Sequence, residues 1–144
     1  MRPPAHRLAA LLAAALLLAG SPALAQDYQV VVHPQNPAAE VAREELSRLF
    51  LKRTQRWPDA TPVDPVEPAD EGLRARFAEV VHGKRLASLR AWWNQQIFSG
   101  REVPPLEKAS DAEVVAFVRT HRGAVGYVAA GAELAGVKVL AVRP

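Results

Sequence analysis

Apolar and polar positions along the chain predict alternating strands and helices from residue 28 onward. Residues 28–32 include three consecutive valines, a pattern that predicts a buried strand. Apolar residues then recur at helical spacing from residue 37 to residue 50, which predicts a helix with Asn36 as its N-cap and proline in its first position. Four prolines between residues 57 and 68 exclude a helix there and leave at most a short edge strand at 63–66.

The second half of the chain continues the alternation. Asp70 can cap a helix that runs to residue 82 and ends at Gly83, and a further helix is expected over 86–98 with an aromatic-rich apolar stripe. Ser110, with Glu113 three positions later, has the spacing of a capping box and starts a fourth helix. Strands are expected at 124–128 and 137–142. This order predicts an α/β domain with a central mixed sheet of about four strands and helices packed on it.

Residues 1–25 have the pattern of a cleavable secretory signal peptide. Arg2 and Arg7 precede an apolar run at 8–18, and small residues at 23 and 25 form a signal-peptidase site. The apolar run is too short to cross a bilayer as a helix, so we expect an exported domain of residues 26–144, in the periplasm and not membrane-spanning after cleavage.

Removal of the predicted leader changes the charge of the chain. The 144 residues carry a formal net charge of +3, and the loss of Arg2 and Arg7 lowers it to +1 because residues 1–25 contain no acid. Such a nearly neutral domain gives no indication of nucleic-acid binding. The absence of cysteine excludes disulfides, thiol nucleophiles and thiolate metal sites.

The residue pattern does not predict catalysis or a metal site. The histidines at 33, 82 and 121 do not have the spacing of metal ligands, and His82 and His121 are expected to cap helix ends beside glycines. No serine lies in a nucleophile-elbow motif, and no glycine-rich phosphate loop occurs. We therefore expect a protein that is not an enzyme and carries no cofactor or metal.

The first candidate ligand site is the turn after the first predicted strand. His33, Gln35 and Asn36 lie at an edge of the sheet, where ligands usually bind in α/β folds. Free amides at the start of the helix expected from residue 37 could hold an anionic or polar ligand there. Simple helix capping by Asn36 is the alternative interpretation.

Several short motifs, taken in order, resemble a known family over roughly residues 28–130. The motifs are Leu49-Phe50-Leu51-Lys52, Arg56-Trp57-Pro58-Asp59, Trp92-Trp93, Ile97-Phe98-Ser99-Gly100, Pro104-Pro105 and Gly123-Ala124-Val125-Gly126-Tyr127-Val128. Together they resemble the periplasmic-binding-protein-like domain of the phosphate ABC transporter substrate-binding family, in its short members. The resemblance implies a type II binding-protein topology, a ligand held at helix N-termini, and no catalysis.

The chain also departs from that family. Full-length receptors close two lobes over phosphate, whereas residues 26–144 have room for a single lobe. Where the family has an arginine followed by Ser-Gly-Thr, the aligned residues 67–72 contain acids and no hydroxyl, and either Arg74 or Arg76 would approach from the helix. The resemblance thus implies ligand contacts at Asp70 and Arg74. Lys52 and Ala60 stand where the family has glycines.

Two functions follow as hypotheses. The first is an exported solute-binding domain that binds a small solute, such as a phosphate-like anion, or assists uptake with a transporter. The second is a protein-interaction module that has lost solute capture and docks an envelope partner through the loop at 53–68. A homodimer is a further expectation, because an isolated lobe leaves uncovered the face that its missing partner would bury.

Overall fold

Five strands form the central sheet of the structure, a computed structural model that describes residues 27–144. The predicted signal peptide lies outside the described residues. In the order in which they lie across the sheet, the strands are β4 (Leu106–Lys108), β3 (Asp64–Pro68), β5 (Ala124–Ala129), β1 (Tyr28–Val32) and β6 (Lys138–Val139). Strands β4, β3 and β5 run parallel, whereas β1 is antiparallel to both β5 and β6. The predicted α/β class with a mixed central sheet is confirmed.

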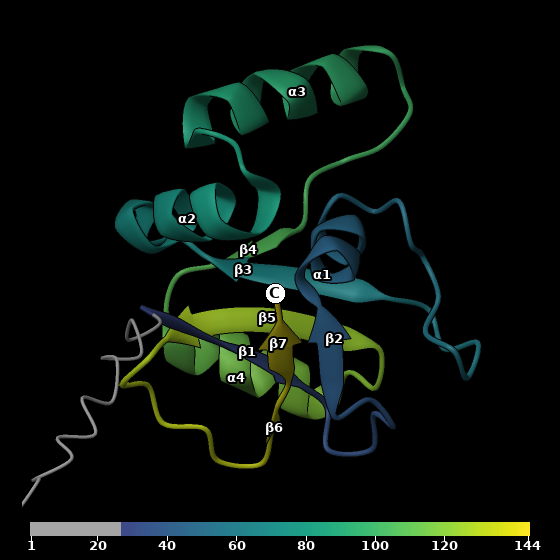
Figure 1. The fold of residues 1–144 in the computed structure, drawn as a ribbon, viewed down its shortest axis with the longest axis vertical. Coiled ribbons are helices and arrows are strands. Elements are labelled where there is room, and N and C mark those ends of the chain that lie inside the picture. The colour runs from purple at the N-terminus through teal and green to yellow at the C-terminus, as the bar shows by residue number, and fades with distance from the viewer. Residues whose placement is uncertain (1–26) are drawn as a thin grey trace, which may run out of the picture.

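The helices cover both faces of this sheet (Figure 1). They are α1 (Arg43–Phe50), α2 (Glu71–Phe77), which continues as a π-helical turn η1 (Ala78–His82), α3 (Leu86–Phe98) and α4 (Asp111–Thr120). Helices α1 and α2 lie on one face and α4 on the other, while α3 lies beyond α2 as an outer layer. No helix within residues 27–144 is both long and apolar enough to cross a membrane.

Alternation along the central strands builds two apolar layers. Tyr28, Val30 and Val32 of β1 pack toward α1 and α2, whereas Val31 packs toward α4. On the side of α1 and α2, Phe77 stacks on Tyr127 with ring centroids 3.8 Å apart. Both apolar layers therefore depend on a sheet that is buried on its two faces.

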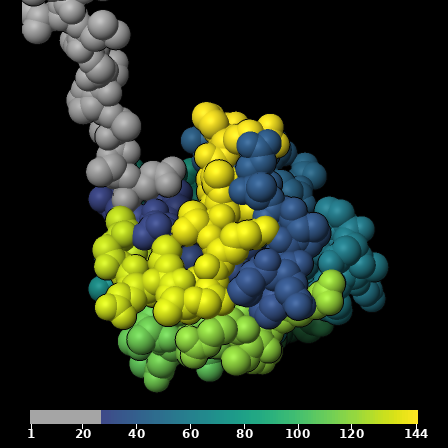
Figure 2. All heavy atoms as spheres, turned by 90° about the horizontal axis from the view of Figure 1, so that it is seen from below, coloured from purple at the N-terminus to yellow at the C-terminus, as the bar shows by residue number. Residues whose placement is uncertain are grey.

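The helix expected from residue 37 begins later, at Arg43. Residues 40–42 instead form strand β2, which pairs in parallel with the C-terminal strand β7 (Ala141–Arg143). Figure 2 shows the C-terminal segment lying against the segment that contains β2. The local helical spacing is overridden because pairing with β7, about 100 residues away in sequence, satisfies the backbone of 40–42.

Strand β3 lies inside the sheet and is not the edge strand that its prolines predicted. It pairs with β5 only over residues 64–66 and with β4 only over residues 66–68. Val66 is thus the one residue that is paired on both sides, and Pro65 and Pro68 each have one neighbouring strand. The two prolines are tolerated here because neither is paired with strands on both of its sides.

The positions where the family has glycines do adopt the glycine-like backbone. Lys52 has φ 56° and Ala60 has φ 69°, the two non-glycine residues with positive φ among residues 27–144. A left-handed conformation costs an L-residue roughly 1–2 kcal/mol, so both positions are held by the surrounding turns. This backbone supports the predicted resemblance at the two places where the side chains depart from it.

The C-terminal end of α3 is more exposed than its apolar stripe predicted. Leu89 and Trp93 are buried against Leu51 and Ala78, as expected. Phe98, however, is 92% exposed, because the helix extends past the elements that it packs against. The aromatic-rich stripe is therefore core at its start and surface at its end.

Candidate functional site

The start of α2 follows the carboxyl end of β3 directly and contains two of the predicted ligand residues. Asp70 caps the helix, with its Oδ1 accepting a hydrogen bond from the backbone amide of Leu73 at 2.8 Å. The predicted N-cap is thereby confirmed. Because its carboxylate is engaged with the helix, one of the free amides that could have held an anion is already satisfied.

Behind the start of α2, a buried carboxylate neutralises the predicted ligand residue Arg74. The Glu67 side chain is 11% exposed, and its Oε1 lies 3.1 Å from Nη2 of Arg74. Nη1 of Arg74 lies 2.9 Å from Glu107, and the Tyr127 hydroxyl donates to Glu67 at 3.1 Å. The guanidinium is thus held between two carboxylates, and its Nε is buried without a hydrogen-bond partner among the described residues.

Burial controls the titration of this cluster. Loss of solvent around Glu67 raises the pKa of its carboxyl above 4.5, although Arg74 and the Tyr127 hydroxyl both act to lower it. Burial together with the adjacent Glu67 carboxylate also raises the pKa of Tyr127 far above 10. The tyrosine therefore remains a hydrogen-bond donor to Glu67 throughout the physiological range.

A hollow beside the N-terminus of α2, which we call the mouth of α2, has three acidic side chains and one basic side chain in its lining. It has a volume of about 360 Å³, and Asp27, Asp70 and Asp111 line it together with Arg76. Asp27 pairs with Arg76, Oδ2 to Nε, at 3.0 Å. Three carboxylates against one guanidinium, itself already paired, give the mouth of α2 a net negative charge, which repels anions.

The other predicted ligand residues form a self-contained turn after β1. The Asn36 Oδ1 accepts from the backbone amide of Ala38 at 2.9 Å, and the His33 Nδ1 accepts from the amide of Gln35 at 3.1 Å. The Nζ of Lys138 donates to the Asn36 carbonyl. Since no helix begins at residue 37, the free helical amides that motivated this site are not there, and that part of the prediction is wrong.

The two groups of predicted residues lie at opposite ends of the sheet. Val32 pairs with Val125, which pairs with Pro65, so the turn at 33–36 lies at the same end of the sheet as the beginning of β3, with β5 between them. Asp70 follows Pro65 by five residues, which at about 3.3 Å per extended residue is a separation of roughly 16 Å. One small solute therefore cannot contact His33 and Asp70 together, and the ligand-binding roles of the five residues remain predictions.

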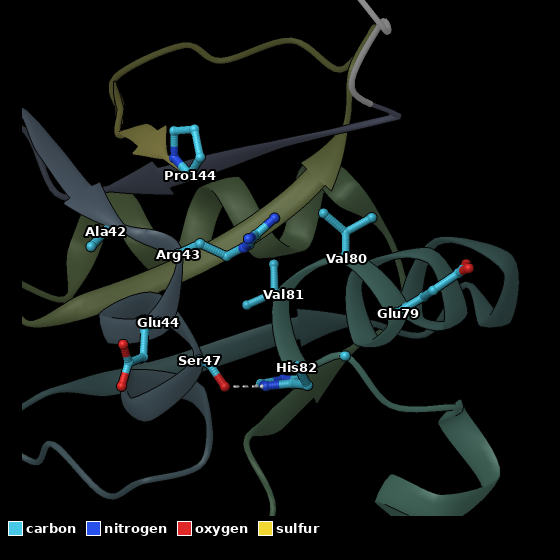
Figure 3. Close-up of a pocket in the computed structure, with 10 residues that line it drawn as sticks. Ala42, Arg43, Glu44, Ser47, Glu79, Val80, Val81, His82 and Pro144 are labelled. Carbon is cyan, nitrogen blue, oxygen red and sulfur yellow. Dashed lines mark hydrogen bonds between the residues drawn. The ribbon is translucent and has the colours of Figure 1, made fainter.

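A larger hollow, with a volume of about 630 Å³, lies beside the N-terminus of α1, which begins at Arg43 (Figure 3). Arg43, Ser47 and His82 line it, with the C-terminal Pro144 at its edge. Sequence reasoning missed this group because Ser47 and His82 are 35 residues apart, and His82 has the appearance of a helix cap. No local motif indicates their proximity; it follows from the packing of α1 on η1.

The contact between Ser47 and His82 does not have the features of a nucleophile and its base. The Ser47 Oγ lies 2.8 Å from Nδ1 of His82. Burial, with a smaller contribution from Lys84, lowers the pKa of His82 from 6.5 to about 4, so the imidazole is a weak base. Within residues 27–144 no carboxylate is hydrogen-bonded to its ring, and no group of three or more acids and histidines is placed to hold a metal.

Comparisons with known proteins give a consistent result at the level of fold. No family model matches the sequence, and no curated protein matches it. Among solved structures, an ABC-type phosphate transport receptor from Vibrio cholerae is similar at 20% identity with a TM-score of 0.63, over 81% of this chain and 46% of that chain. A protein from Clostridium perfringens with bound phosphate, described as a phosphate ABC transporter substrate-binding protein, gives 16% identity, a TM-score of 0.61, and 81% and 44% coverage.

These similarities confirm the predicted periplasmic-binding-protein-like fold. At these identities they concern the fold alone. The chain spans less than half the length of the receptors that it matches. What those proteins bind therefore bears on this chain only as the starting point of a proposal.

Proposed function

We propose that this chain is a non-enzymatic, exported domain of the solute-binding type that assists the uptake of a small solute by an ABC transporter. One observation carries the proposal: 81% of the chain superposes on phosphate-transport receptors. The predicted signal peptide at 1–25 supports a periplasmic location, where such receptors work. The fold provides a location for a binding site, and the chemistry of the residues that line that site determines which solute binds.

The proposed solute site is the hollow at the mouth of α2, which contains Asp70; Arg74 does not line this hollow and is paired with Glu67 and Glu107. A phosphate dianion entering the hollow would approach three aspartates, and it would have to displace Glu67 to reach Arg74. The charges instead favour a solute that brings positive charge or hydrogen-bond donors, such as a cationic or zwitterionic molecule. The turn at His33, Gln35 and Asn36 is too distant to take part in the same site.

A thermal-shift screen of the purified protein tests this proposal. The panel consists of phosphate, sulfate, L-lysine, L-arginine and glycine betaine. A solute present at about one hundred times its dissociation constant stabilises the folded state by about 2.7 kcal/mol, which raises the unfolding midpoint measurably. We expect the unfolding midpoint to rise with at least one of the positively charged or zwitterionic solutes and not to rise with phosphate.

The substitution Asp70→Asn provides the matched test of location. Asparagine caps a helix as well as aspartate does, so the variant removes charge and keeps the cap. The Asp70→Asn substitution should abolish the solute-dependent rise in the unfolding midpoint. Asp59→Asn is the control, because Asp59 also accepts a backbone amide in an exposed turn, at Thr61, but lies outside the hollow. A rise with phosphate, or no rise with any solute, would contradict the proposed site.

One observation favours the second candidate function, a protein-interaction module of the cell envelope. The end of α3 exposes large apolar side chains, with Ile97 48% and Phe98 92% exposed. Contiguous exposed apolar surface typically marks an interaction site. The loop at 53–68, where docking was predicted, begins beside this end of α3.

A further inference from the structure

Basic side chains gather where the segment after α1 meets the end of α3. Lys52, Arg53 and Arg56 lie on that segment, and Arg101 lies just past α3. They line two adjoining hollows of about 390 and 310 Å³, which share Lys52, Gln55 and Glu102. We call the two hollows together the basic groove.

The basic groove has a surplus of positive charge. Glu102 is the single acid that lines it, and its Oε1 lies 3.6 Å from the Nζ of Lys52. Within residues 27–144, Arg53, Arg56 and Arg101 form no ion pair with a carboxylate. The guanidinium groups of Arg53, Arg56 and Arg101 thus have no carboxylate partner among these residues, although Nη1 of Arg56 donates to the Ala60 carbonyl at 3.0 Å.

Aromatic and apolar side chains flank these charges. The guanidinium carbon of Arg53 lies 5.8 Å from the centroid of the Trp92 ring, which fixes the arginine over the indole. Ile97 and Phe98 on the last turn of α3, and Val103 just beyond Arg101, are about half exposed or more. These three apolar residues do not line the two hollows, but each lies within two positions of Gln96 or Glu102, which do, so apolar surface adjoins the positive charge of the groove.

We propose that the basic groove docks an acidic segment of a partner protein, with its carboxylates on the arginines and an apolar side chain against Phe98. Charge complementarity selects the partner, because three unpaired guanidinium groups bind carboxylates strongly and in bidentate geometry. The extent of the groove over two hollows and its apolar flank fit an extended peptide better than a compact anion. This docking does not depend on solute capture at α2.

Fluorescence anisotropy with a synthetic peptide tests the docking. The probe is a fluorescein-labelled, glutamate-rich peptide that contains one phenylalanine, and the control peptide has glutamine at every glutamate. We expect the purified protein to bind the first peptide and not the second. Binding should weaken as salt is raised, since exposed charge pairs are screened over about 10 Å at 0.1 M salt.

Two variants assign the binding to the groove. The double substitution Arg53→Glu and Arg101→Glu should weaken binding at least tenfold. The charge-matched control is a second double substitution, Lys84→Glu and Arg85→Glu, at the other end of α3. Phe98→Ser should weaken binding several-fold, with Val139→Ser as the control at an exposed apolar residue of another element, strand β6. Both groove variants change exposed side chains, and circular dichroism checks that each is folded.

Each other outcome overturns the proposal. Failure of the wild-type protein to bind the acidic peptide at low salt would do so, as would equal losses in the groove and control variants. Displacement of the peptide by citrate at equal concentration of carboxylate would make a small anion the occupant. A dimer that buries Phe98 without any peptide, detected by light scattering, would make a second copy the occupant. The solute screen at α2 is unaffected by any of these results.

Discussion

Acid is expected to destabilise this protein through His82. Its ring packs edge-on against Phe77, with centroids 5.6 Å apart, and its Nδ1 lies 2.8 Å from the Ser47 hydroxyl. Burial and the nearby Lys84 lower the pKa of His82 from 6.5 to about 4. The unfolded chain therefore takes up a proton near pH 6.5, while the folded protein does so only near pH 4.

The size of the effect follows from this difference in pKa. Because the pKa of His82 is depressed in the folded state, the stability contributed by the neutral ring is present above pH 6.5 and lost as the pH falls toward 4. As the pH falls from about 7.5 to about 5, the number of extra protons bound by the unfolded state rises from nearly zero to almost one. Linkage gives a loss of about 2 kcal/mol in the free energy of unfolding.

Urea unfolding at a series of pH values, followed by tryptophan fluorescence, measures this loss. The variant His82→Gln should lack most of the decrease between pH 7.5 and 5, whatever its absolute stability. His121→Gln is the control, since His121 is exposed at the end of α4. The raised pKa of Glu67 acts in the opposite direction, but it is common to all three proteins and cancels in the comparison.

An equal pH dependence of His82→Gln and the wild-type protein would contradict this role of His82. That result would mean that the imidazole takes up its proton in the folded state as easily as in the unfolded state.

Three substitutions test the packing and backbone that position the sites, each by urea unfolding. Ala60→Gly should stabilise the protein by about 1 kcal/mol because φ is 69° there, whereas Ala75→Gly, in helix α2, should destabilise it by a similar amount. Gly126→Ala should lower the free energy of unfolding by about 1–3 kcal/mol, since a Cβ would lie 2.9 Å from side-chain atoms of both Val66 and Val114. Gly131→Ala is the control and should lower it much less, because a Cβ there would meet open space. Trp57→Phe should cost about 2 kcal/mol, because it removes the buried Nε1 donor to the Gly123 carbonyl at 2.9 Å and leaves a void.

Elements with local start and stop signals were predictable from the sequence. Asp70 and Ser110 cap α2 and α4 as expected, and Gly83 takes the left-handed conformation that ends the helical turn before it. The buried strands β1 and β5 were equally clear, because consecutive apolar residues bounded by polar ones have few alternatives. These features depend on interactions within a few residues, which sequence patterns record.

Features that depend on distant partners were not predictable. Strand β2 exists because β7 pairs with it, and β3 is internal because β4 and β5 pair with different parts of it. The contact between Ser47 and His82 and the burial of Glu67 against Arg74 arise in the same way from packing. The resemblance to phosphate receptors did locate the acids at 67–72 but could not show that Glu67 turns inward to neutralise Arg74.

The most direct test of the central claim, a solute site at the mouth of α2 that excludes phosphate, is an NMR titration of backbone amides. L-lysine, glycine betaine and phosphate are added in turn to the ¹⁵N-labelled protein. We expect the amide signals of residues 70–74, together with those of Asp111 and Ala129, to shift on addition of a positively charged or zwitterionic solute and not to shift with phosphate. Shifts at these amides with phosphate, or at residues 33–36 with any solute, would contradict this claim.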